Sequence, residues 1–85
     1  MPSTTVTVGS SIGLHARPAG VIAAAATETG VPVTLSVAGS EPVDAGSALL
    51  IMTLGAKLGD EVTVTSDNAD AVAAISTLVA SDLDA

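Results

Sequence analysis

The sequence predicts an α+β fold: an open-faced sandwich in which a four-stranded antiparallel sheet is covered on one face by three helices. Short segments alternate apolar and polar residues with the period of a half-buried strand, and Ala-rich or helically spaced apolar segments separate them. The predicted order is β-α-β-β-α-β-α, which favours an antiparallel sheet with its helices on one side. The 85 residues fit a single domain spanning residues 1–85.

The first half of the chain supplies two strands and a helix. Residues 4–8 alternate Thr and Val and predict the first strand. An Ala-rich run over residues 16–29 predicts a helix, because Pro18 stands near its start and Gly30 directly follows its end. Residues 33–37 alternate again and predict the second strand.

A short strand and a short helix follow the turn that comes after the second strand. Residues 41–43 predict the third strand, and Pro42 places it at an edge of the sheet because proline cannot donate to a ladder. Residues 47–54 predict the second helix, with Asp44 as a candidate cap at its start and Gly55 closing its end.

The last strand and the last helix complete the predicted core. Residues 61–66 alternate as a strand, and the last helix begins near Asp67 or Asn68. Inward-facing strand residues are expected to meet the apolar stripes of the first and last helices. The strand set is Val6, Val8, Val33, Leu35, Val37, Val62 and Val64; the helix set is Ile22, Ala23, Ala26, Val72, Ile75 and Val79, with Leu83 extending the last stripe.

Composition excludes several classes of function. The net charge is −7, with nine acidic residues against Arg17 and Lys57, so a nucleic-acid-binding surface is not expected. The longest apolar run, residues 21–26, is far too short to cross a bilayer. The chain has no cysteine, which excludes disulfides, thiolate metal sites and thiol catalysis and suits a cytoplasmic location. We expect no metal and no cofactor.

One short segment, residues 13–19, gathers residues suited to phosphate chemistry. His15 is the only histidine, and it lies just before the predicted first helix, where free N–H groups and the positive end of the helix dipole favour anions. That environment also favours the neutral imidazole, which is the nucleophilic form. Arg17 is permanently charged and can bind phosphate oxygens with two N–H groups. Pro18 fits the first helical turn, and Gly13 allows a tight bend before it.

The spacing of these residues resembles a known family. Gly-Leu-His-Ala-Arg-Pro-Ala at positions 13–19 is similar to the active-site signature of the HPr family of bacterial phosphocarrier proteins. Residues 45–56, Ala-Gly-Ser-Ala-Leu-Leu-Ile-Met-Thr-Leu-Gly-Ala, resemble the regulatory serine segment and short helix of that family. Length and element order agree as well, so the resemblance covers nearly the whole chain.

The resemblance implies a phosphocarrier of the sugar phosphotransferase system rather than an enzyme. Enzyme I, charged by phosphoenolpyruvate, would phosphorylate Nδ1 of His15, and His15 would pass the phosphoryl group to the IIA domain of a sugar permease. Arg17 would stabilise the phosphoryl group, with Ala16, Arg17 and Pro18 forming the anion site at the helix start. The protein is expected to be a monomer, and partners would dock on an apolar patch formed by Gly20, Leu49, Leu50 and Met52.

Ser47 has two interpretations. At a helix start a serine commonly acts as a cap. By resemblance it is also a candidate phosphoserine, which adds a serine kinase and a transcriptional regulator as further candidate partners. The chain departs from the family pattern here, because Gly46 stands where many members have Lys or Arg, and few basic residues lie along the first helix. A partner recognised through charge would therefore lose electrostatic steering.

Other functions remain as alternatives. The first alternative is a carrier in a different branch, nitrogen-regulatory or dihydroxyacetone-kinase, because such a carrier would share the motif. A regulatory HPr-like binding module that does not transfer phosphate is a second alternative, although the presence of His15 argues against it. A small-ligand-binding α+β domain lacks a Gly-rich phosphate loop, and a hydrolase lacks a partner for the histidine.

Overall fold

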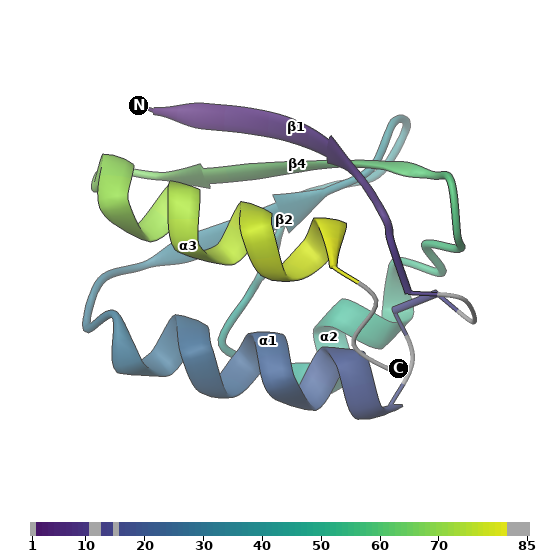
Figure 1. Ribbon diagram of the computed structural model, residues 1–85, viewed down its shortest axis with the longest axis horizontal. Helices are drawn as coiled ribbons and strands as arrows, with labels where there is room; N and C mark the ends of the chain where they lie inside the picture. Colours follow the sequence, from purple (N-terminus) through teal and green to yellow (C-terminus); the bar gives the residue numbers. More distant parts are fainter. Residues whose placement is uncertain (1, 11–12, 15, 82–85) are drawn as a thin grey trace.

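The computed structural model describes residues 2–10, 13–14 and 16–81, which form the predicted α+β sandwich (Figure 1). The order of elements is the predicted β-α-β-β-α-β-α. The elements are β1 (Ser3–Thr7), α1 (Ala16–Glu28), β2 (Val33–Ser36), β3 (Val43–Asp44), α2 (Ala48–Thr53), β4 (Glu61–Ser66) and α3 (Ala69–Ala80). Each predicted element is therefore present, and its predicted ends agree with the observed ones to within two residues.

The four strands form one antiparallel sheet in the order β1-β4-β2-β3. The first strand therefore pairs with the last one, from Ser3 opposite Thr65 to Thr7 opposite Glu61. The short strand β3 lies at an edge, as Pro42 predicts. It begins later than predicted, because only Val43 and Asp44 pair with β2.

The core lies between the sheet and the three helices, which Figure 1 shows on one side of the sheet. Most predicted core residues are buried, including Ile22, Leu35 and Ile75. Val6 and Val37 are only partly buried, since Val6 lies on edge strand β1 and Val37 follows the end of β2. Leu83 lies outside the described residues.

Asparagine and serine cap the two later helices. The Asn68 side chain accepts hydrogen bonds from Asp70 N (2.9 Å) and Ala71 N (3.1 Å) at the start of α3. Ser47 caps α2, because its Oγ accepts a bond from Leu50 N at 3.3 Å. The prediction of Asp44 as this cap is wrong. Asp44 belongs to β3, and its Oδ1 accepts instead from Gly46 N in the turn between the two elements.

The segment that leaves β1 packs closely on the end of α3. Gly9 N donates to Val79 O at 3.1 Å, and a Cβ on Gly9 would overlap the carbonyl group of Ala80. Ser10 is buried beside it, and its Oγ donates to Ser81 O at 3.3 Å. These contacts fix the chain shortly before the segment that contains the predicted site.

Candidate functional site

The two residues that precede the predicted phosphorylation site, Gly13 and Leu14, pack against the segment that follows α2. Leu14 is buried in the core, and its N–H donates to Ala56 O at 2.9 Å. Gly13 has φ +80°, and a Cβ there would lie 2.5 Å from Ala56 O and 2.9 Å from Lys57 Cα. Gly13 is therefore required for both its backbone conformation and its lack of a side chain.

The first turn of α1 begins with two exposed residues, Ala16 and Arg17, which are followed by two buried ones, Pro18 and Ala19. One side of the helix start therefore packs on the core, and the other side faces solvent. Pro18 is the third helical residue, where the N–H that proline lacks would have no intrahelical partner. The N–H groups of Ala16 and Arg17 belong to the set that a helix leaves without an acceptor of its own.

Arg17 presents its charge to solvent at this helix start. Its side chain forms no ion pair with any residue in the described part of the chain. His15, the predicted phosphoryl acceptor, lies outside the described residues. The described residues on either side of it, Leu14 and Ala16, are respectively a core residue and the first residue of α1.

The predicted docking residues lie on two helices that pack against each other, α1 and α2. Ile51 alone of the apolar α2 residues is fully buried, so Leu49, Leu50 and Met52 face outward with exposed fractions of 70%, 40% and 36%. Gly20 is exposed on α1. We call these four residues, together with Val21, the apolar surface.

Sequence reasoning did not include Val21, which is 40% exposed. The helical spacing from Arg17, four residues earlier, was the signal that could have placed it on the same face of α1. The close contact of Gly13 with Ala56 was also missed, because those residues are far apart in the sequence.

Arg17 and the start of α1 are the described parts of the predicted phosphoryl-binding site. Among the described residues, no three His, Cys, Asp or Glu side chains lie together in a way that would hold a metal ion. Within the same residues, no helix is long and apolar enough to span a membrane. What the arrangement offers is one arginine, the free N–H groups of a helix start and a neighbouring apolar surface.

Comparison with known proteins gives the same family from sequence and from structure. A family model described as "PTS HPr component phosphorylation site" matches residues 2–81. The phosphocarrier protein HPr of Streptomyces coelicolor is 47% identical over 78 residues, which cover 92% of this chain and 84% of that relative. The phosphocarrier protein HPr of Mycoplasma capricolum is 32% identical over 75 residues, covering 88% and 83%.

A solved structure has the same fold. The phosphocarrier protein HPr from Bacillus anthracis superposes with a TM-score of 0.83 and is 28% identical, with 92% of this chain and 95% of that chain covered. The family model, the sequence relatives and the fold therefore agree, and the chain belongs to the HPr family, the phosphocarrier proteins of the sugar phosphotransferase system.

Proposed function

We propose that His15 is the residue that carries the phosphoryl group, receiving it from Enzyme I and passing it to the IIA domain of a sugar permease. The observation that carries this proposal is the position of the only histidine in the chain, between core residue Leu14 and the exposed start of α1. Enzyme I and IIA domains are the partners that membership of the HPr family implies.

The transfer needs a nucleophilic nitrogen and an in-line approach. The Nδ1 lone pair of neutral His15 attacks phosphorus while the bond between phosphorus and the donor atom of Enzyme I breaks. The onward step reverses these roles, because the bond from Nδ1 to phosphorus breaks as the acceptor of the IIA domain attacks. No water and no second protein nucleophile are required on the carrier.

Arg17 and the helix start are proposed to hold the phosphoryl oxygens. The guanidinium can donate two parallel hydrogen bonds to them, and the N–H groups of Ala16 and Arg17 add donors at the positive end of α1. Pro18 contributes to this anion site by favouring the helical backbone of the first turn, and it supplies no N–H of its own. Because the site is exposed, it binds the phosphoryl group loosely enough for onward transfer.

The apolar surface is proposed as the docking site for both partners. It adjoins the start of α1, and it exposes large apolar side chains on a short helix. Ser47 lies at its edge as the cap of α2. A kinase that modified Ser47, or a transcriptional regulator that recognised the modified residue, would act at this edge. The protein is proposed to bind these partners as a single-domain monomer.

Phosphorylation with labelled phosphoenolpyruvate and purified Enzyme I tests the proposal. Wild type should acquire one label that is stable in base and labile in acid, as phosphohistidine is. His15→Ala should acquire none while keeping the circular dichroism spectrum of wild type. Label that persists in a folded His15→Ala variant would contradict the assignment.

A further inference from the structure

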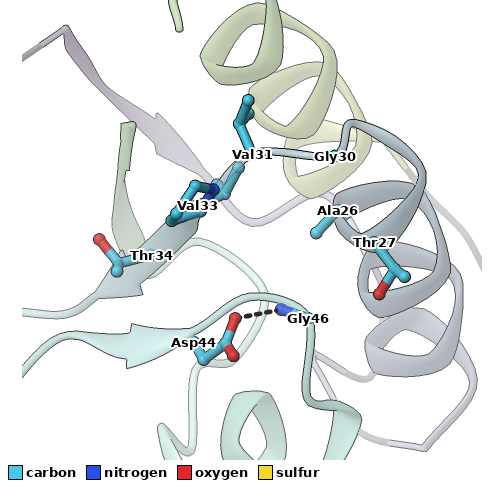
Figure 2. Close-up of a pocket in the computed structure, with 9 residues that line it drawn as sticks. Ala26, Thr27, Gly30, Val31, Val33, Thr34, Asp44 and Gly46 are labelled. Atoms are coloured by element: carbon cyan, nitrogen blue, oxygen red, sulfur yellow. Dashed lines mark hydrogen bonds between the residues drawn. The ribbon is translucent and has the colours of Figure 1, made fainter. Parts of the chain in front are cut away.

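A cavity of about 410 Å³ lies between the C-terminal end of α1, the start of β2 and the turn that joins β3 to α2 (Figure 2). Thr27 and Gly30 line it from the helix end, Val33 from β2, and Asp44 and Gly46 from the turn. This volume is sufficient for a single large side chain or a small ligand. None of the residues used in the proposed transfer reaction lines it.

Gly46 keeps one wall of the cavity open. A Cβ on Gly46 would lie 3.2 Å from Asp44 Oδ1 and 3.5 Å from Thr27 Oγ1. The backbone of Gly46 does not have a positive φ, so its conformation does not demand glycine. What the glycine supplies is space, which any larger residue would reduce.

The polar groups around the cavity attract a cation. The Asp44 carboxylate is held at the wall by Gly46 N, which donates to its Oδ1 at 2.8 Å, and Figure 2 shows this carboxylate and Thr27 on either side of the open space. Thr27 Oγ1 donates to Ala23 O, so its remaining capacity is that of an acceptor. The last turn of α1, which carries no basic residue, adds the negative end of its dipole.

Among the described residues, no cationic side chain pairs with Asp44. Arg17 and Lys57 are the only Lys or Arg residues of the chain, and neither forms an ion pair with Asp44. The net charge of −7 also attracts a positively charged partner over a longer range. Charge complementarity therefore selects a basic group on another molecule.

The cavity and the apolar surface lie along the same two segments of the chain, α1 and the turn and helix that follow β3. Exposed residues recur along α1 every three or four positions from Arg17 through Gly20, Val21 and Ala24 to Thr27. Ten residues of helix separate Arg17 from Thr27, a distance of roughly 15 Å along the axis. On the other helix, Gly46 directly precedes the cap of α2. A protein docked on the apolar surface would thus reach the cavity at its far end.

The face between these two ends carries no charge of its own. Residues 18–27 and 45–56 contain no Asp, Glu, Lys or Arg. An ion pair at the cavity would therefore be the main electrostatic contact of this face away from Arg17, and it would fix the orientation of the docked partner.

We propose that this cavity receives a Lys or Arg side chain of Enzyme I when Enzyme I docks on the apolar surface. The inference rests on the proposed function, and it adds the chemistry of the partner's docking face: apolar at its centre, with a basic residue at the edge farthest from the start of α1. Asp44 and Gly46 are then specificity-determining residues, one through its charge and the other through the space it leaves.

Steady-state phosphorylation by Enzyme I purified from the same organism tests the inference. Asp44→Asn removes the charge and keeps the acceptor for Gly46 N, and it should raise the KM of Enzyme I for the carrier about tenfold, with kcat within about twofold of wild type. Gly46→Leu keeps the charge but fills the cavity, and it should raise KM similarly. Glu61→Gln, which removes one exposed charge on β4, is the matched control and should leave KM unchanged.

A double-mutant cycle identifies the partner residue. Lys→Ala and Arg→Ala variants of Enzyme I are combined with Asp44→Asn, and one basic residue should lose its effect on KM when Asp44 is already neutral. Unchanged KM values in both folded carrier variants, or changed values with no coupled basic residue in Enzyme I, would overturn this inference alone. A wild-type chain that accepts no phosphoryl group would overturn the proposed function and this inference with it.

Discussion

Gly13 and Gly20 lie seven residues apart. A methyl group added at Gly13 would clash with neighbouring atoms, whereas one added at Gly20 would lie in open space. At Gly13 it would press on Ala56 O with the backbone at φ +80°, whereas at Gly20 nothing lies within 4 Å. Gly13→Ala should lower the free energy of unfolding by about 2 kcal/mol or more. Gly20→Ala should raise it by up to about 1 kcal/mol, because alanine favours the helix.

Urea denaturation of the two variants and wild type measures both effects. The pair controls for the change in composition, since each variant adds the same methyl group. A Gly13→Ala variant as stable as wild type would show that the segment before α1 can move away from Ala56 at no cost.

Arg17 differs from Gly13 because it is exposed, whereas Gly13 is buried. Arg17→Glu should slow phosphoryl transfer from Enzyme I at least about tenfold, since it removes a charge-assisted contact to the phosphoryl oxygens. It should change the free energy of unfolding by about 1 kcal/mol or less, as exposed charges at helix starts do. Transfer rates at partner concentrations below saturation, together with thermal melting, separate these effects.

Lys57→Glu is the control for net charge, because it changes the charge of the chain by the same amount. If Lys57→Glu slowed transfer as much as Arg17→Glu does, the effect would belong to long-range attraction of the partner. A specific role for Arg17 would then be contradicted.

Among the elements, α2 is a short helix with a serine cap at its start. It has six residues, and the Ser47 side chain satisfies the N–H of Leu50 at its start. Ser47→Ala should therefore lower the free energy of unfolding by about 1 kcal/mol. Ser47→Asp and Ser47→Asn both keep a capping oxygen and should melt close to wild type.

The comparison of Asp with Asn tests whether charge at this edge of the apolar surface regulates docking. Ser47→Asp should slow phosphorylation of the carrier by Enzyme I, because it places a negative charge beside an apolar interface. Ser47→Asn, which carries no charge, should transfer at the wild-type rate. Equal rates for the two variants at every Enzyme I concentration would leave Ser47 with a capping role only.

At the scale of the whole molecule, stability rests on a core without aromatic residues. Ile75 is fully buried on α3, which contacts β1, β4 and α1. Ile75→Ala should destabilise the protein by about 2–5 kcal/mol, and Ile75→Val by about 1 kcal/mol. In a domain of this size each kcal/mol lowers Tm by about 4–8 °C, so calorimetry distinguishes the two variants. A Tm within a few degrees of wild type for Ile75→Ala would contradict the assignment of a single shared core.

Local sequence patterns determined most of the secondary structure. The alternation in residues 61–66 predicted β4 with its observed bounds. In a half-buried strand, successive side chains point to opposite faces, so buried apolar and exposed polar residues alternate in the sequence. The last helix was predicted to begin near Asp67 or Asn68, and Asn68 is its cap. The residues at 13–19 were sufficient to indicate the family, since the chemistry of phosphate binding depends on residues that are close together in the chain.

Contacts between distant segments were decided only by the tertiary structure. No local pattern shows that β1 pairs with β4 or that Gly13 lies against Ala56. The cavity at the end of α1 belongs to this class as well, because its walls come from three elements that meet only when the sheet is assembled. Periodicity reports which face of an element is apolar, whereas the identity of the partner that covers that face depends on how all the elements pack together.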